Sequence, residues 1–367
     1  MNEAVIFGYY GKGNLGDETN LQCLVGYLNA HFSNIKISVI TADPIGTLEK
    51  LGSGIQVIGK NDFPAILRVF KKADCLIGGG GSLFQDSTSR RSVFYYATLI
   101  FLARFFKLRI ILYGQGIGPV QTISGKCLVG MALSMVDVVT VRDRLSVIAL
   151  ANLHVRKPEI HFTADPLLQL SAVSPEKITA FWQNYAISKP RRVGLIVREI
   201  PQKKNDFWYQ MLDSLKWDNN LEIYIMIMEP ADIRIGTEIA SNYGLELFEV
   251  NDWEKLQSII GGMSFVWSSR LHGLIAAVNQ GISCCGLALD PKIDGFCLPL
   301  AIPYLAVDPD LDRITLSARI TNALTTKQTW FSQIDFWKVR SMENQIILKQ
   351  FILNGLPYPF NLDPASK

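Results

Sequence analysis

The stretch MSFVWSSRLHGLIAAVN, residues 263–279, contains the pattern that decides the fold. Its apolar start, 263–267, predicts a buried β-strand, and its apolar end, 274–279, predicts a helix. The polar turn between them places Arg270 and His272 where a strand ends and helical N–H groups begin, which is a natural site for an anion. A histidine that only caps a surface turn explains the position of His272 equally well, so the other motifs of the chain must distinguish the two.

The same alternation of short apolar runs with helical patterns continues along the chain and indicates βαβ units on parallel sheets. We expect strands at 4–7, 36–41, 75–77, 109–113, 138–141, 193–197, 222–228, 265–267 and 283–287. We expect helices at 17–32, 63–70, 93–106, 124–135, 206–215, 233–243, 252–260 and 274–280. A polar segment with three prolines, 165–191, separates the two halves. We therefore predict an N-terminal domain at 1–172, a C-terminal domain at 173–335, and a terminal helical segment at 336–367 that returns to the N-terminal domain.

Composition excludes several classes of function. The 367 residues include 36 basic and 33 acidic side chains, for a net charge of +3, and no run of five basic residues occurs. Nucleic acid is therefore not expected as a partner. The six cysteines show neither CxxC pairing nor metal-ligand spacing, so we expect reduced thiols, no metal site and a cytoplasmic location. The N-terminus lacks the positively charged region of a signal peptide.

One apolar run, 93–103, bears on membrane contact. It is uncharged for eleven residues and is then interrupted by Arg104 and Lys107. A membrane span needs about 20 apolar residues, so the run is too short to cross a bilayer. A buried core helix is the favoured interpretation, and a helix that touches the inner face of the membrane is the alternative.

The first glycine-rich loop, GYYGKGNLGDE at 8–18, spells the dinucleotide-binding pattern GxGxxG. In a true dinucleotide site the helix start meets a pyrophosphate, but here Asp17 and Glu18 occupy that place and would repel it. We therefore reject the dinucleotide interpretation. Asp17 remains a candidate general base, with an acidic helix cap as the alternative.

Two more glycine-rich loops follow predicted strands. In GGGGS, residues 78–82, four consecutive glycines bring backbone N–H groups close to a ligand, whereas a tight turn needs only one or two. GQGIGP, residues 114–119, is explained equally well as a plain turn. The candidate substrate-binding residues of the chain are Gly13, Asn14, Gly79, Gly80, Gly81, Ser82, Gln115, Ser268, Ser269 and Gly273.

A fourth motif, TVRDR at 140–144, ends a strand with two arginines. If the strand geometry continues, Arg142 and Arg144 share one face, and the alternative is an ion pair with Asp143. Lys292 adds a cation after the last strand. Because open α/β sheets bind ligands at the carboxyl ends of their strands, two facing domains would collect all of these groups in the cleft between them. Three cations with glycine loops indicate a small anion that carries phosphate and carboxylate.

Six motifs in this order resemble the polysaccharide pyruvyl transferase family, in particular its cell-wall, CsaB-like type. They are GYYGKGNLGDE, GGGGSLFQD, YGQGIGP, TVRD, SSRLHG and DPKI, and together they span most of the chain, from about residue 4 to residue 296. The resemblance implies a GT-B-like α/β fold, with two Rossmann-like domains whose parallel sheets face across a deep cleft. It also implies transfer of a pyruvyl group from phosphoenolpyruvate to two hydroxyls of one sugar, which forms a cyclic ketal and releases phosphate.

The resemblance carries catalytic roles onto Asp17, Arg142, Arg270, His272 and Lys292. It implies a sugar acceptor from cell-wall or exopolysaccharide synthesis, which is lipid-linked if the family's cell-wall role applies. Phosphoenolpyruvate is then a co-substrate, and no cofactor or metal is expected. A nucleotide-sugar glycosyltransferase of the same fold is the alternative, and it would use an acid such as Glu229 to bind a ribose. A non-catalytic carbohydrate-binding protein is disfavoured, because binding alone needs no acid–base pair.

Overall fold

The computed structural model describes residues 1–86, 90–200, 206–307, 312–326 and 328–353. The chain forms two compact units. Unit 1 consists of Met1–Lys12, Gly16–Leu167 and the chain from Trp337 onward, and unit 2 consists of Gly13–Leu15 and Leu168–Phe336. Part of the predicted terminal segment, 354–367, lies outside the described residues.

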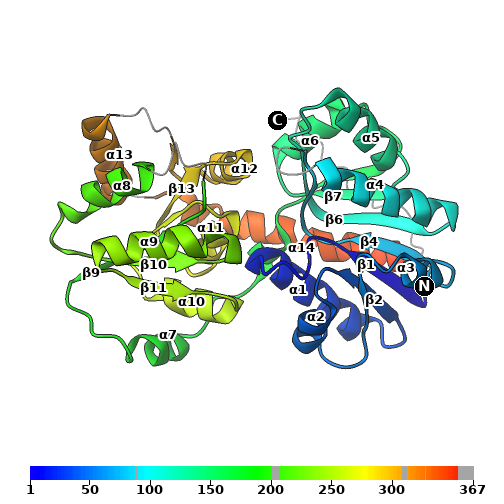
Figure 1. The fold of residues 1–367 in the computed structure, drawn as a ribbon, viewed down its shortest axis with the longest axis horizontal. Helices are drawn as coiled ribbons and strands as arrows, with labels where there is room; N and C mark the ends of the chain where they lie inside the picture. The colour runs from blue at the N-terminus through cyan, green and yellow to red at the C-terminus, as the bar shows by residue number, and fades with distance from the viewer. Residues whose placement is uncertain (87–89, 201–205, 308–311, 327, 354–367) are drawn as a thin grey trace. The chain divides into compact units, whose positions relative to one another are not determined.

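Unit 1 is built on a parallel sheet (Figure 1). Its strands lie in the order β3 (Gln56–Gly59), β2 (Lys36–Thr41), β1 (Glu3–Phe7), β4 (Cys75–Gly78), β6 (Arg109–Ile117), β7 (Val138–Val141) and β8 (Glu159–Phe162), and β5 (Gly81–Phe84) pairs with β6. The helices are α1 (Leu15–His31), α2 (Pro44–Leu51), α3 (Phe63–Phe70), α4 (Arg90–Phe105), α5 (Ile123–Leu133), α6 (Arg144–Asn152) and most of α14 (Ile334–Ile352). Every pairing in this sheet is parallel, as the βαβ pattern requires.

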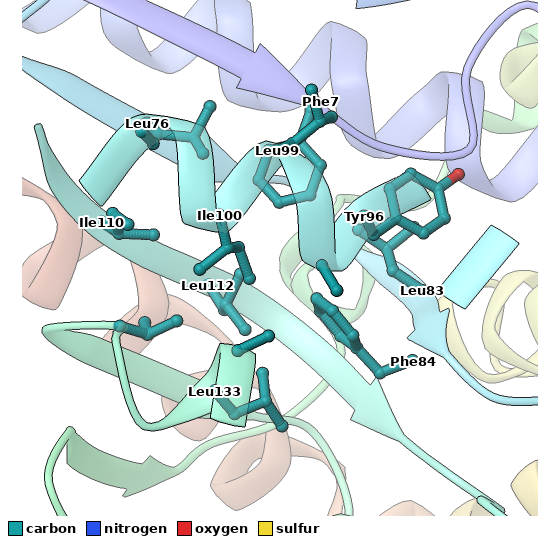
Figure 2. Close-up of a cluster of buried hydrophobic side chains, with 14 of the residues drawn as sticks. Phe7, Leu76, Leu83, Phe84, Tyr96, Leu99, Ile100, Ile110, Leu112 and Leu133 are labelled. Atoms are coloured by element: carbon teal, nitrogen blue, oxygen red, sulfur yellow. The ribbon is translucent and has the colours of Figure 1, made fainter. Parts of the chain in front are cut away.

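Alternate residues of each strand point to opposite faces of the sheet, and the two faces have different covers. Ala4 and Ile6 of β1 point to the face that α1 and α14 cover, while Val5 and Phe7 point to the face that α3, α4 and α5 cover. Figure 2 shows the second cluster, in which α4 lies against β4 and β6 and the hydroxyl of Tyr96 points away from the apolar side chains. The predicted core helix at 93–106 is therefore confirmed.

Unit 2 is a second parallel sheet, in the order β11 (Glu246–Glu249), β10 (Leu221–Ile227), β9 (Arg191–Ile196), β12 (Phe265–Ser268), β13 (Cys284–Ala288) and β14 (Tyr304–Ala306). Its helices are α7 (Pro175–Trp182), α8 (Asp206–Lys216), α9 (Ile233–Tyr243), α10 (Trp253–Gly261), α11 (Leu271–Asn279), α12 (Pro291–Leu300) and α13 (Arg313–Thr325). Side chains of α8, α9 and α13 pack with Leu195, Ile225 and Trp267 of the sheet. Helix α11 contacts β12 and β13.

Several local expectations need correction. The segment predicted as a polar linker, 165–191, contains a short 3₁₀ helix (Pro166–Gln169), helix α7 and the first residue of β9. Strand β6 continues to Ile117, so the first four of the six residues of the GQGIGP motif are strand rather than loop. The predicted glycine loop at 78–82 contains the end of β4 and the start of β5. The α/β class with two parallel Rossmann-like sheets is confirmed.

Candidate active site

In unit 2, the charged residues of interest follow four neighbouring strands. Glu229 comes after β10, Arg198 after β9, Arg270 after β12 and Lys292 after β13. Since all four strands are parallel, these residues lie at one edge of the sheet. The sequence analysis singled out Arg270 and Lys292 at this edge but missed Arg198.

Two carboxylates hold the Arg270 guanidinium. Its Nε and Nη2 donate to Oδ2 of Asp232 at 2.9 and 2.5 Å, and its Nη1 forms an ion pair with Glu229. Asp232 is fully buried, and this burial raises its pKa, while the charge of Arg270 acts in the opposite direction. These contacts use three of the five guanidinium N–H groups, so Arg270 is fixed in orientation and keeps donors for a ligand. The sequence analysis missed Asp232.

The SSRLHG motif forms the turn that carries Arg270 into α11. Ser268 Oγ donates to the Arg270 carbonyl at 2.7 Å, and Ser269 Oγ donates to the Ile196 carbonyl at 2.9 Å. A side chain at Gly273 would overlap Ile196 and Ser268. Ser268 and Ser269 are buried and their hydroxyl protons support the turn, and substrate contact by these two residues stays a prediction.

His272 lies in the first turn of α11, is half-buried, and follows Arg270 at the helix start. Within the described part of the chain, no side chain caps this helix terminus by a hydrogen bond. The first-turn N–H groups of α11 and the imidazole therefore belong to the same short segment, at a positive helix end. This arrangement suits an anionic ligand that also needs a proton donor.

Lys292 and Arg198 share one carboxylate. Asp290 Oδ2 lies 3.7 Å from Lys292 Nζ and 3.7 Å from Arg198 Nη1. The other oxygen, Oδ1, accepts a hydrogen bond from the Lys292 backbone N–H at 3.1 Å and caps α12. At 3.7 Å both ion pairs are longer than a direct hydrogen bond.

In unit 1, Arg142 is the buried cation. Its Nη1 donates to Asp165 Oδ2 at 2.7 Å, and its Nη2 donates to Ser82 Oγ at 3.1 Å. Asp143 lies farther away, 3.9 Å from Nε, and instead caps α6 through Ser146. The sequence analysis proposed an ion pair with Asp143 and missed Asp165.

Arg144 does not share a face with Arg142. Strand β7 ends at Val141, and Arg144 is the first residue of α6, where its side chain is exposed. The alternation expected from a continued strand therefore fails, because Asp143 turns the chain into a helix. Of the two arginines, only Arg142 points into the interior of unit 1.

Asp17 is buried in the first turn of α1, as its acidic start predicted. A side chain on Gly81 would overlap its carboxylate, and Gly81 has a φ of +117°, which favours glycine. The next residue, Ser82, contacts Arg142. Asp17 and Arg142 therefore lie on either side of one dipeptide. Glu18 has a separate structural role, because it accepts the Gly11 N–H at 2.7 Å.

The other glycines of the second loop have protein neighbours. Side chains at Gly79 and Gly80 would overlap Tyr10 and Asn20, so close packing alone accounts for both glycines. Gln115 is fully buried, and its amide donates to the Gly79 carbonyl, which ties β6 to this loop. Gln115 therefore supports the loop, and its contact with substrate stays a prediction.

Hydrogen bonds from two residues of α14 support the ion pair between Arg142 and Asp165. Asn344 is fully buried; its amide nitrogen donates to the Ala164 carbonyl at 2.8 Å, and its oxygen accepts from Thr140 and Thr163. Ser341 donates to the Asp165 carbonyl at 2.7 Å. The carboxyl ends of β7 and β8, and with them Asp165, are thus held by a helix about 180 residues away in the sequence.

Gly13 and Asn14 belong to the short segment that groups with unit 2. Gly13 has a φ of +73°, and a side chain there would press on Pro230. The next residue but one, Leu15, donates its N–H to the Met228 carbonyl at 3.3 Å. The glycine is therefore explained by its backbone conformation and by its approach to Pro230.

The described residues contain no group of three or more His, Cys, Asp and Glu side chains that could hold a metal ion. Nor does any helix among them combine the length and apolar character needed to cross a bilayer. Metal-independent catalysis stays a prediction.

A model of the polysaccharide pyruvyl transferase family matches residues 14–291. The chain belongs to this family. The match extends from the Asp17 loop to the start of α12. It therefore includes Asp17, Arg142, Arg270 and His272. A comparison of this sequence with curated proteins found no match.

Solved structures show the same fold at low identity. The Anabaena protein Alr3699/HepE in complex with UDP and glucose has a TM-score of 0.64 at 12% identity, over 96% of this chain and 99% of that one. A UDP-bound MnaA from S. aureus has a TM-score of 0.65 at 10% identity, over 98% of both chains. A UDP-GlcNAc 2-epimerase from Neisseria meningitidis, bound to UDP-GlcNAc, has a TM-score of 0.63 at 12% identity, over 97% and 100%. This pyruvyl transferase family member therefore has the GT-B-like architecture of UDP-sugar enzymes.

Proposed function

We propose that the protein transfers the pyruvyl group of phosphoenolpyruvate to two hydroxyls of one sugar in a cell-wall or exopolysaccharide precursor. Membership of the pyruvyl transferase family supports the group transferred. The observation that carries the donor assignment is the start of α11, where Arg270, whose guanidinium is held by two carboxylates, is the N-cap residue and His272 lies in the first turn. Phosphoenolpyruvate has a phosphate and a carboxylate, and arginine recognises both.

In the proposed reaction, Arg270, Lys292 and Arg142 bind the donor, with Arg198 as an added cation. His272, as imidazolium, donates a proton to the vinyl carbon, and the adjacent carbon develops positive charge. Asp17 accepts the proton of the attacking sugar hydroxyl. A second hydroxyl of the same sugar then displaces phosphate and closes the ketal. The protons balance, because the vinyl carbon gains one and the two hydroxyls lose two, the second of which leaves with phosphate.

The carboxylate partners modify this picture. Arg142, Arg270 and Lys292 each have an acidic neighbour, so the predicted trio of cations is largely neutralised within the protein. Preorganised donors of this kind stabilise charge without reorganisation during the reaction. We therefore assign orientation of the donor to the two arginines, and charge compensation to Lys292 and Arg198.

The test is acceptor-dependent phosphate release from phosphoenolpyruvate, with N-acetylmannosamine-containing sugars as acceptors and mass spectrometry of the product. We expect release only with a suitable acceptor, together with a product heavier by one pyruvate ketal. His272→Ala should lower turnover by about 10²–10⁴-fold, the usual effect of a lost acid–base group. His31→Ala is the matched control, because His31 is exposed in the last turn of α1.

Turnover with a nucleotide sugar and none with phosphoenolpyruvate would refute the proposal and favour the glycosyltransferase alternative. That alternative assigned ribose binding to Glu229, whose carboxylate is ion-paired with Arg270 in this structure. A near wild-type rate for His272→Ala would refute the role of His272 even if the transfer itself is confirmed.

A further inference from the structure

A pocket lies in unit 1, and none of the residues assigned to the donor lines it. It has a volume of about 580 Å³ and opens where β1 and β2 end and α4 begins. Three cations, Lys12, Lys60 and Arg91, and four tyrosines line it. We call it the basic pocket, after these three cations. Its size lies within the usual range for small-molecule sites.

The charge of the basic pocket is one-sided. None of the described residues that line it is acidic. Burial, and after it the charge of Lys12, lowers the pKa of Lys60, so the two ammonium groups are close enough to repel each other. Within the described part of the chain, none of the three cations forms an ion pair with a carboxylate, in contrast to Arg142, Arg270 and Lys292. An anionic ligand would relieve this repulsion.

The tyrosines give the pocket a fixed wall. Tyr95 donates its hydroxyl to the Lys60 carbonyl at 2.9 Å, and Tyr96 donates to the Gly8 carbonyl at 3.3 Å. Tyr95 and Tyr96 also pack edge to face, with ring centroids 5.4 Å apart. Rigid aromatic surfaces with a polar tip suit the alternating apolar and hydroxyl faces of a sugar ring.

The inner wall of the pocket adjoins the proposed general base. Tyr10 and Tyr96 both line the pocket. Burial and then the charge of Asp17 raise the pKa of each of these two tyrosines, which places the Asp17 carboxylate near both rings. A ligand that fills the pocket therefore contacts tyrosines on which the Asp17 carboxylate acts.

We propose that the basic pocket binds the acceptor as a sugar phosphate, with its phosphate or diphosphate on Lys12, Lys60 and Arg91 and its ring against the tyrosines. The assignment rests on the proposed function, because it names the acceptor of that reaction. It adds that the acceptor is recognised by a phosphate group and is not a free sugar.

Binding is measured first, by isothermal titration of the full chain with glucose 1-phosphate, methyl glucoside and inorganic phosphate as probes. We expect glucose 1-phosphate to bind more tightly than either fragment. The double variant Lys12→Ala/Lys60→Ala should weaken this binding at least about tenfold, since each charged hydrogen bond contributes on that order. The control Lys71→Ala/Lys72→Ala removes the same charge from exposed positions at the end of α3 and should bind like the wild type.

Three results would overturn the proposal. Equal binding of glucose 1-phosphate by the pocket variant and the control would show that Lys12 and Lys60 do not contact the ligand. Binding of inorganic phosphate as tight as that of glucose 1-phosphate would reduce the pocket to an anion site without sugar recognition. Titration with phosphoenolpyruvate separates acceptor from donor, because a tenfold loss in Lys12→Ala/Lys60→Ala would assign the pocket to the donor. These titrations need no turnover, so they remain decisive even if phosphate release from phosphoenolpyruvate fails.

Discussion

Replacement of Asp165 by asparagine should destabilise unit 1 substantially. The side chains of Arg142 and Asp165 are 4% and 2% exposed, and their 2.7 Å contact is the shortest that Arg142 makes. Removing one partner of a buried ion pair costs roughly 3–5 kcal/mol, because the other charge stays buried without compensation. Asp143 remains 3.9 Å from Arg142 and Ser82 still accepts a hydrogen bond, so we expect the lower end, about 3 kcal/mol.

The double variant Arg142→Met/Asp165→Asn isolates the pair. Arg142→Met alone removes the cation that compensates the Asp165 carboxylate, whereas the double variant removes both charges of the pair. The double variant should therefore be more stable than the sum of the single changes predicts, by about 2 kcal/mol. Urea unfolding followed by far-ultraviolet circular dichroism gives these free energies of unfolding.

The assay needs a local readout as well. Six of the seven tryptophans lie in unit 2 and only Trp337 lies in unit 1, so tryptophan fluorescence mainly follows the wrong unit. Hydrogen exchange of peptides from β7 and β8 reports the affected region directly. A loss below about 0.5 kcal/mol for Asp165→Asn, or strictly additive single changes, would refute the view that this pair is a coupled buried contact.

Further predictions concern three residues of unit 1 and the dependence on metal. Arg144→Ala should leave the KM for phosphoenolpyruvate unchanged and alter the free energy of unfolding by less than about 0.5 kcal/mol, because the side chain is exposed; an increased KM would contradict its position. Gly81→Ala should cost roughly 2 kcal/mol or more in urea unfolding, from a φ of +117° and overlap with Asp17; wild-type stability would argue against this packing. Asn344→Ala should lower the free energy of unfolding by about 2–3 kcal/mol, because it leaves buried groups such as the Ala164 carbonyl without their hydrogen bond to Asn344. Calorimetry checks this, and an unchanged melting temperature would show that the Asn344 hydrogen bonds do not stabilise unit 1. Excess EDTA should leave phosphate release unaffected, and loss that added Mg²⁺ restores would overturn metal independence.

The strands that the sequence predicted correctly are the interior ones. Strands such as β4 and β7 are buried on both faces and so appear as continuous apolar runs. Of the five strands that it missed, β5 pairs with β6 and overlaps the predicted glycine loop. The other four, β3, β8, β11 and β14, lie at the edges of the two sheets. Each is three or four residues long and partly exposed, for example Glu246–Glu249 with a single buried residue. Half-exposed edges carry mixed polar side chains, which no periodicity distinguishes from a loop.

The cations of the site were predictable, but their partners were not. Arg142 and Arg270 follow apolar strands directly, so local pattern places them at a sheet edge. Their main carboxylates, Asp165 and Asp232, are 23 and 38 residues away and arrive on neighbouring elements. Adjacency in the sequence favoured Asp143 instead, but Asp143 caps the N-terminus of α6. The choice depends on tertiary contacts that no local pattern contains.

The C-terminal helix also sets an order of assembly. Unit 2 is almost continuous in sequence, whereas the β1 face that α1 covers in unit 1 is completed only when Ile347, Leu348 and Phe351 of α14 have been synthesised. Domains usually fold as soon as their residues emerge from the ribosome. Here the second unit can fold first, and the N-terminal unit completes its core last. The Arg142–Asp165 pair then takes its final position only when Asn344 and Ser341 arrive, so synthesis of the site ends with the chain's last described helix.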